Sequence, residues 1–232
     1  MTFLDLWTKG FLLYDGMTVT RYAVSMIVGS LVACMIIPYL LGSVNSAIII
    51  SRLLYRNDVR SHGSGNAGMT NMLRTYGKAA AGLTLLGDLL KTVLAVACGS
   101  FTLGSNFGGW IACLFCMLGH IFPIFYKFRG GKGVLCAATG ILLLSPFSFL
   151  FCFLVFFVLV AATRYVSLGS VVSALMLPLF VNAYNKMFET GGINGLVAVL
   201  MALVILWCHR KNLERISRRE ESKLSFGKKK DQ

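Results

Sequence analysis

A short basic stretch with three glycines, Lys127–Gly133, carries residue types that can bind an anion. It reads Lys-Phe-Arg-Gly-Gly-Lys-Gly and lies between two strongly apolar segments. Glycines let successive backbone N–H groups converge on an anion, and the cations supply a positive field. The stretch is not a Walker phosphate loop, because no glycine stands at the required distance before Gly131-Lys132 and Val134 replaces the magnesium-binding hydroxyl. A basic loop that only sets membrane topology is the alternative interpretation.

A second polar stretch, residues 61–74, combines glycines with side chains that donate hydrogen bonds. It reads SHGSGNAGMTNMLR, so glycines alternate with hydroxyls and amides, and Arg74 closes the run. A helix that begins near Asn66 would point its N-terminal amides and the positive end of its dipole at a ligand. The stretch therefore suits an oxyanion site, with a solvated loop of glycine turns as the alternative.

The chain has the composition of a polytopic membrane protein. Of its 232 residues, 56% are hydrophobic and 13% are charged, and the mean hydropathy is +0.74. A soluble domain is far less apolar. The formal net charge of +13 comes from cations beside apolar segments, which favours anionic lipid head groups and phosphorylated substrates over nucleic acid as partners.

The apolar segments predict an all-α integral membrane protein with seven transmembrane helices. Residues 134–163 are interpreted as two short crossings divided at Ser145-Pro146, because two crossings keep the 127–133 cations, Arg164 and the basic C-terminal tail on one face. The N-terminus then lies outside and the C-terminus in the cytoplasm. The other expected spans are residues 22–54, as one long or broken helix, 79–103, 110–126, 168–185 and 193–209.

The same pattern predicts how the chain is divided. Residues 1–20 lack the pattern of a cleavable signal peptide, and residues 104–109 are expected to form a short outer turn. Residues 1–213 are expected to form a single membrane domain. Residues 214–232 are expected to form a basic cytoplasmic tail that is solvated or lies on the membrane.

Several polar residues fall inside the apolar segments. Asp88 and Lys91 are three residues apart, so we expect them to pair on one helical face. His120 is expected to be a hydrogen-bonded core residue. Cys113 and Cys116 form a lone CxxC, which predicts packing and not a metal or redox site.

In this topology, four polar clusters share the cytoplasmic face: residues 64–74, 127–133, 164–167 and 209–212. They hold cations, hydroxyls, amides and one imidazole, but no cluster of carboxylates. Metal-dependent hydrolysis and catalysis by paired acids are therefore not expected. Such a site suits phosphates and the stabilisation of developing negative charge.

The motifs that carry these clusters resemble those of the bacterial acyl-phosphate:glycerol-3-phosphate acyltransferase (PlsY) family. The matching stretches are GSGNAGMTN with Arg74, GHIFPIFYKFRGGKGV, RYVSL and HRKN, in the family's order and over most of residues 40–213. The resemblance implies a seven-helix enzyme of the bacterial inner membrane. It would move an acyl group from acyl phosphate to glycerol 3-phosphate and so make lysophosphatidic acid for phospholipid synthesis.

The resemblance also implies roles for residues of the site. The catalytic residues would be Ser64, Arg74, Lys132, His209 and Asn212. The residues that bind substrate phosphate would be Gly65, Asn66, Thr70, Asn71, Gly130, Gly131, Gly133 and Ser167. Acyl phosphate, glycerol 3-phosphate and the lipid bilayer would be the partners, with no metal, no cofactor, no nucleic acid and no obligate protein partner.

The chain departs from the usual family pattern at a few positions. Met69 replaces an alanine, Leu135-Cys136 replace small residues, and Asn45-Ser46 replace an apolar pair; we expect these changes to alter packing or acyl-chain fit. Lys211 replaces a glutamate, which removes a carboxylate that could brace the last motif. The geometry near His209 is the part of the site that this change affects.

The expected mechanism uses no enzyme nucleophile. The glycerol hydroxyl attacks the acyl carbonyl while the cations hold both phosphates. Either a substrate phosphate, whose pKa lies near 6, or His209 accepts the proton. The chain lacks the HxxxxD signature of acyltransferases that use acyl-CoA. A transporter of organic phosphates is the alternative function, because broken helices aimed at anions are also a transporter feature.

Overall fold

The computed structural model describes residues 21–103, 105–188 and 193–224, and these residues form helices and their connections, with no strand among them. The all-α prediction is confirmed. Six helical segments in this part of the chain are long and apolar enough to cross a membrane: Val28–Tyr55, Lys78–Leu103, Phe107–Tyr126, Pro146–Thr163, Val166–Met187 and Asn194–Ser217. Residues 1–20 and 225–232, which include the predicted outer N-terminus and the last lysines, lie outside the described residues.

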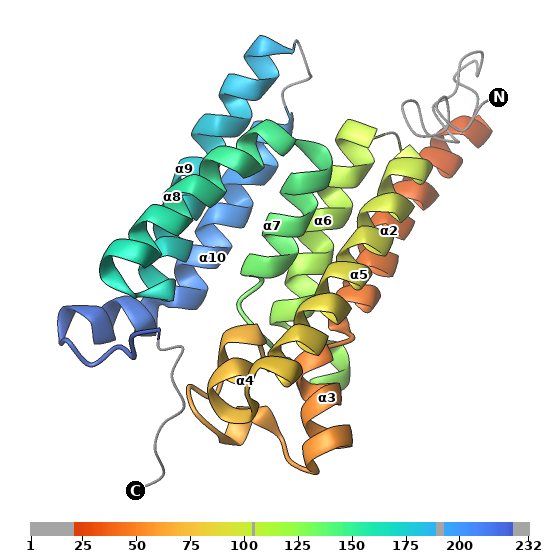
Figure 1. The fold of residues 1–232 in the computed structure, drawn as a ribbon. Helices are drawn as coiled ribbons and strands as arrows, with labels where there is room; N and C mark the ends of the chain where they lie inside the picture. The colour runs from red at the N-terminus through yellow and green to blue at the C-terminus, as the bar shows by residue number, and fades with distance from the viewer. Residues whose placement is uncertain (1–20, 104, 189–192, 225–232) are drawn as a thin grey trace, which may run out of the picture.

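The first apolar segment is a broken helix. Helix α2, Arg21–Ser43, ends two residues before Asn45, and α3, Ser46–Tyr55, begins directly after it. Asn45 caps α3, since its side-chain oxygen accepts a hydrogen bond from the backbone N–H of Ile48 at 3.1 Å. Figure 1 shows α3 at the lower end of the bundle beside α4, Met69–Tyr76.

Helices α5, Lys78–Leu103, and α6, Ser105–Ile121, follow with only residue 104 between them. The predicted outer turn over residues 104–109 is therefore wrong. A Cβ atom at Gly108 would overlap the carbonyl oxygen of Gly99, so the two glycines allow the backbones of α5 and α6 to touch. Gly108-Gly109 serves a close helix contact, although in the sequence it has the composition of a turn.

The break predicted in residues 134–163 is confirmed. Helix α7, Val134–Leu144, is separated by Ser145 from α8, Pro146–Thr163, and the proline stands at the start of α8, where its missing N–H costs no hydrogen bond. A short 3-10 turn, Ile124–Tyr126, and the 127–133 loop connect α6 to α7. Helix α7 is largely buried, whereas α8 exposes most of its phenylalanine and leucine side chains.

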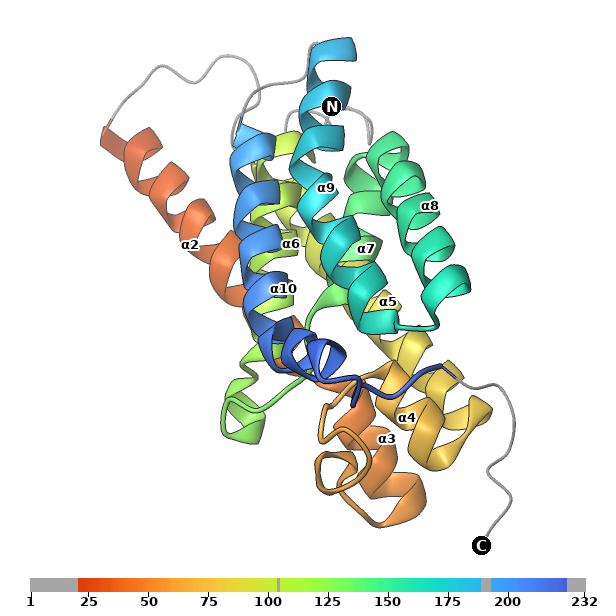
Figure 2. The same cartoon turned by 90° about the vertical axis from the view of Figure 1, so that its left-hand side faces the viewer.

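The last two long helices are α9, Val166–Met187, and α10, Ile193–Ser217. Residues 218–224 then turn back across the lower end of the bundle, in front of α4 in Figure 2. The backbone N–H of Leu224 donates to the carbonyl oxygen of Arg164 at 2.8 Å. Most residues of this turn are exposed, as expected for a solvated tail, but Glu221 is buried.

The hydrophobic core lies among α6, α7, α9 and α10. Its largest fully buried side chains include Trp110, Met117, Leu177 and Met201. Cys113 and Cys116 are free and buried, as the packing interpretation predicted. Within the described residues, no group of histidine, cysteine or acidic side chains is arranged to hold a metal ion.

Candidate active site

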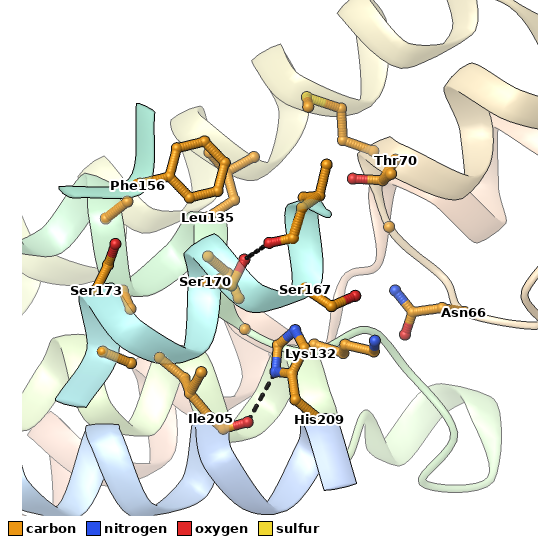
Figure 3. Close-up of a pocket in the computed structure, with 18 of the residues that line it drawn as sticks. Asn66, Thr70, Lys132, Leu135, Phe156, Ser167, Ser170, Ser173, Ile205 and His209 are labelled. Atoms are coloured by element: carbon orange, nitrogen blue, oxygen red, sulfur yellow. Dashed lines mark hydrogen bonds between the residues drawn. The ribbon is translucent and has the colours of Figure 1, made fainter. Parts of the chain in front are cut away.

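A cavity of about 450 Å³ opens among the 61–74 loop, α4, the 130–133 loop and helices α5 to α10, and Asp88 of α5 and His120 of α6 are part of its wall. At its polar end, Figure 3 shows Lys132, His209, Ser167 and Asn66 facing one another. Most residues proposed for the site from the sequence line its wall: Ser64, Asn66, Thr70, Asn71, Arg74, Lys132, Gly133, Ser167, His209 and Asn212. Gly65, Gly130 and Gly131 lie outside this wall.

The glycine loop packs directly on the end of α6. The N–H of Gly131 donates to the carbonyl oxygen of His120 at 3.0 Å, and the N–H of Gly130 donates to that of Ile121 at 3.1 Å. These two amides are already used, so they do not form the free anion nest that the sequence suggested. Helix α7 begins directly after Gly133, whose φ of +76° is typical of glycine, and the first N–H groups of a helix have no partner within the helix.

Lys132 points from this loop into a hydrogen-bonded network. Its ammonium group donates to Oδ1 of Asn212, and Nδ2 of Asn212 donates to Oγ of Ser167 at 3.0 Å. Burial lowers the pKa of Lys132 to about 8. The side chain is therefore mostly protonated and positively charged at neutral pH, but it loses its proton at a lower pH than an exposed lysine does.

Glu221 joins this network from the segment after α10. Its Oε1 accepts hydrogen bonds from Asn212 Nδ2 at 2.7 Å and from Ser167 Oγ at 2.6 Å, and its Oε2 pairs with Arg215 Nε at 2.8 Å. Burial alone would raise the pKa of Glu221. The hydrogen bonds from Ser167, Asn212 and Arg215 outweigh burial and lower that pKa below its ordinary value.

Sequence reasoning missed Glu221 because its place depends on a chain reversal after Ser217. A charged run of mixed sign gives no local sign of that reversal. Lys211, where the family pattern has a glutamate, is exposed. The carboxylate that braces Asn212 comes from Glu221, nine residues further along the chain.

The 61–74 loop is held in shape by Asn71. The Asn71 side chain donates to the carbonyl oxygens of Val59 at 3.0 Å and His62 at 2.9 Å, and it accepts from the N–H of Ser64 at 2.9 Å. Asn71 is 1% exposed and its amide is occupied, so it supports the loop. Ser64, Asn66 and Thr70 line the cavity together with Asn71.

Arg74 lies at the rim of the cavity and is exposed. Its guanidinium donates to the carbonyl oxygen of Ser222 at 3.0 Å. This contact joins the 61–74 loop to the segment that carries Glu221. The guanidinium is thus beside both the polar end and the solvent.

His209 is buried on α10, with its ring at the same polar end. One ring nitrogen, Nδ1, lies 2.8 Å from the carbonyl oxygen of Ile205. A carbonyl oxygen can only accept, so Nδ1 carries the proton, and a neutral ring has its lone pair on Nε2. Nε2 can therefore accept a proton or a hydrogen bond.

The rest of the cavity is mostly apolar and runs between α7, α8 and α9, with Ser170 and Ser173 also in its wall. In Figure 3, Phe156 and Leu135 lie on the side away from Lys132. The apolar lining comprises Met69, Leu85, Val134, Leu135, Ala137, Ala138, Ile141, Phe149, Cys152, Phe153, Phe156, Val166, Ala174, Leu177 and Ile205. A ligand with a phosphate at one end and a hydrocarbon chain at the other matches this division of the wall.

Residues 32–219 match the family model described as glycerol-3-phosphate acyltransferase. The chain belongs to the glycerol-3-phosphate acyltransferase family. It is 40% identical over 193 residues to the glycerol-3-phosphate acyltransferase of Syntrophomonas wolfei, which covers 83% of this chain and 96% of that protein. It is 38% identical over 202 residues to that of Clostridioides difficile, covering 84% and 95%.

Two solved structures of a family member share the fold. PlsY (YgiH), described as an integral membrane glycerol 3-phosphate acyltransferase, aligns in its glycerol 3-phosphate form with a TM-score of 0.73 and 32% identity. Its lysophosphatidic acid form aligns with a TM-score of 0.70 and 31% identity. Each alignment covers 85% of this chain and 96% of the other. The family resemblance in the sequence motifs is confirmed.

Proposed function

We propose that this chain transfers a fatty acyl group from acyl phosphate to glycerol 3-phosphate, giving lysophosphatidic acid and inorganic phosphate. The observation that carries the proposal is the cavity itself, whose polar end gathers Lys132, Arg74 and His209 while its other end is apolar. Solved structures of PlsY in glycerol 3-phosphate and lysophosphatidic acid forms support the same substrate and product for this chain.

The cations and hydroxyls would hold the two phosphates close together. Lys132 faces the polar end, and α7 begins two residues later, so that Lys132 and the N-terminus of α7 would bind glycerol 3-phosphate. Ser64 and Arg74 would bind the phosphate of the donor, and Ser167 and Asn212 would orient Lys132. Holding both reactants in one geometry removes much of the entropy cost of their meeting.

The chemical step would be a direct transfer. The hydroxyl oxygen of glycerol 3-phosphate attacks the acyl carbonyl carbon, the bond from that carbon to the phosphate oxygen breaks, and inorganic phosphate leaves. The hydroxyl proton passes to a phosphate dianion, whose pKa lies near 6, or to Nε2 of His209, which is placed to accept it. Lys132 stabilises the negative charge that develops.

We also propose that the chain crosses the bacterial inner membrane seven times, with its C-terminus in the cytoplasm. Helix α7 has 11 residues, about 16 Å in length, whereas the hydrocarbon core is roughly 30 Å thick. Figure 1 supports a crossing here, since α7 and α8 run in opposite directions along the bundle. Non-helical backbone such as the 130–133 loop is tolerated at membrane depth where protein encloses it.

The experiment uses purified protein in detergent with glycerol 3-phosphate and one acyl donor at a time. We expect lysophosphatidic acid and phosphate from acyl phosphate, little product from acyl-CoA, and no loss of activity with a chelator. Equal turnover from acyl-CoA would contradict the proposed donor. Glycerol 3-phosphate uptake into proteoliposomes without acylated product would instead favour the transporter.

A further inference from the structure

A buried ion pair spans the break between α2 and α3. Nζ of Lys91 lies 2.8 Å from Oδ1 of Asp88, as the helical spacing predicted, and the two residues are 6% and 1% exposed. Nζ also donates to the carbonyl oxygens of Gly42 at 3.1 Å and Val44 at 3.0 Å. A charged pair within membrane-spanning helices is costly, so its position calls for a role.

The pair matches the electrostatics of the broken helix. Carbonyl groups at the end of α2 have no partner within the helix, and the cation of Lys91 satisfies two carbonyls at the break. On the other side of the break, the Asp88 side chain of α5 lies beside the start of α3, where its Oδ1 accepts a hydrogen bond from Oγ of Ser46 at 3.0 Å. The Asn45-Ser46 departure from the family pattern therefore provides a cap for α3 and a hydrogen bond to Asp88.

Lys91 also orients His120, the core histidine of α6. Its Nζ lies 2.9 Å from Nδ1 of His120. An ammonium group has only donors, so Nδ1 accepts and the neutral ring carries its proton on Nε2. A Cβ atom at Gly131 would overlap this Nε2, which places the edge of the ring directly against the glycine loop.

The same break is connected to both loops of the active site. Nδ2 of Asn45 donates to the carbonyl oxygen of Ala67 at 3.3 Å. The N–H of Ala67 in turn donates to the carbonyl oxygen of Gly130 at 3.4 Å. The backbone of His120 accepts from Gly131. Two chains of contacts thus lead from the broken helix to the loop that carries Lys132.

We propose that Asp88 and Lys91 are positioning residues, which act through the His120 ring to hold the Gly130–Gly133 loop in the shape that binds glycerol 3-phosphate. The inference rests on the proposed function of that loop. Lys91 would fix the position and orientation of the ring, and the ring would pack against Gly131. Loss of this support should weaken glycerol 3-phosphate binding more than it slows the chemical step.

The test is a mutant cycle between the pair and the ring. The double change Asp88→Asn with Lys91→Met removes both charges together, so neither is left buried and unpaired. His120→Phe keeps a ring in place but removes the acceptor for Lys91. Each variant should raise the KM for glycerol 3-phosphate about tenfold, with kcat within about threefold of the parent protein.

If the effects of the variants on the KM are not additive, Lys91 and His120 act through the same contact. If Lys91 acts through His120, the triple variant should show the same increase of about tenfold, because the link is already broken in each parent variant. Ser46→Ala is the matched control, since it removes a hydrogen bond to Asp88 and leaves the Lys91 contact with His120. It should keep the parent KM.

Two results would overturn the inference in protein whose thermal unfolding stays cooperative. One is an unchanged KM in both variants, and the other is an increase of about a hundredfold in the triple variant, which would mean independent effects. The proposed function is judged separately by product formation in the parent protein. If the parent forms no product, calorimetry of glycerol 3-phosphate binding to the same variants tests positioning directly, and equal affinities in all of them would contradict it.

Discussion

Glu221 accepts a hydrogen bond from Asn212, with 2.7 Å between Oε1 and Nδ2. An amide side chain has a donor end and an acceptor end, so this bond decides which end faces Lys132. With Nδ2 held by Glu221 and Ser167, Oδ1 is left to accept from the ammonium group. A carboxylate outside the motifs of the family therefore orients the amide that positions the loop lysine.

Removal of the Glu221 carboxylate should reduce activity. In Glu221→Ala, Asn212 loses a partner and can rotate its oxygen away from Lys132. We expect kcat/KM to fall by an amount equivalent to about 1–3 kcal/mol, which is typical when a buried hydrogen-bonding group loses its partner. Steady-state kinetics with acyl phosphate and glycerol 3-phosphate measure this loss.

The control is Glu214→Gln. Glu214 also pairs with an arginine of the same region, Arg218, but both side chains are more than half exposed. An exposed pair contributes little, so this variant should retain the parent rate. Equal effects of the two substitutions would show that Glu221 has no special part in the site.

The binding of glycerol 3-phosphate should weaken as pH rises above about 8, since burial lowers the pKa of Lys132 to about 8. Below that pH Lys132 is charged and attracts the phosphate, and above it the charge is lost. The KM measured from pH 6.5 to 9.5 should therefore rise at the alkaline end. Lys132→Arg keeps its charge over this range, so its KM should not show that rise.

Folding stability should respond to the same titration in the opposite direction. The pKa of Lys132 is about 8 in the fold and about 10.4 in an unfolded chain, so between these values the unfolded state binds more protons. Stability attributable to Lys132 then increases with pH over this window.

The KM prediction has its own contrary outcome. A KM for glycerol 3-phosphate that stays flat to pH 9.5 in the parent protein would contradict the assignment of Lys132 as the phosphate ligand.

Charge and backbone shape can be separated within the glycine loop. Lys132→Met should raise the KM for glycerol 3-phosphate, as deprotonation does, and should also lower kcat by the equivalent of about 2–4 kcal/mol, because it removes a charge from the developing oxyanion. Gly131→Ala should raise the KM for glycerol 3-phosphate without such a loss of kcat, since its Cβ would overlap the His120 ring and the carbonyl oxygen of Ala67. Initial rates over a matrix of both substrate concentrations distinguish the two effects.

Gly82→Ala is the matched control for the alanine substitution. Gly82 lies in α5, and a Cβ atom there would meet no neighbouring atom within 4 Å. Its kinetics should equal those of the parent protein. Near-normal kinetics in Lys132→Met and Gly131→Ala, with folded protein, would mean that the loop does not bind substrate and only sets the membrane topology.

Sequence reasoning was most successful where local pattern decides structure. Apolar length located the long helices, and the proline after Ser145 marked the division of α7 from α8. It failed where the outcome depends on contacts between distant segments. Gly108 continues a helix because Gly99 lies against it, and the amides of Gly130 and Gly131 bond to α6 in place of an anion.

The polar loops could be assigned to one site because a membrane topology brings their ends to the same face. The position of Glu221 could not be predicted in this way, since it follows from how residues 218–224 fold back on Arg164 and Arg74. No periodicity or spacing encodes such a return. The buried Asp88 and Lys91 pair and the hydrogen-bonded core position of His120 were predicted, but the contact between Lys91 and His120 was not.

Single cysteines in a cysteine-free background should report the membrane topology. Cysteines at Ser61, Arg129 and Ser222, all exposed, should react with an impermeant reagent only from the cytoplasmic side. A cysteine at Thr190, which lies outside the described residues, should react only from the opposite side. Labelling of Ser222 and Arg129 from different sides would refute two crossings over residues 134–163.

The apolar part of the cavity should set the length of acyl chain that the enzyme accepts. Ala174 of α9 is 6% exposed and lines this part, so Ala174→Phe would fill space that a hydrocarbon chain needs. Each buried CH₂ group contributes about 0.8 kcal/mol, so excluding even two of them should cost about tenfold in kcat/KM for a long-chain donor. Shorter acyl phosphates should be affected less.

The matched control is Ala161→Phe, because Ala161 is exposed on α8 and does not line the cavity. Parent and variant proteins are compared with acyl phosphates that differ only in chain length, at saturating glycerol 3-phosphate. We expect the preferred length to shorten in Ala174→Phe and to stay the same in Ala161→Phe. An equal loss for all chain lengths would mean that the substitution disturbs the polar end, and that the acyl chain lies elsewhere.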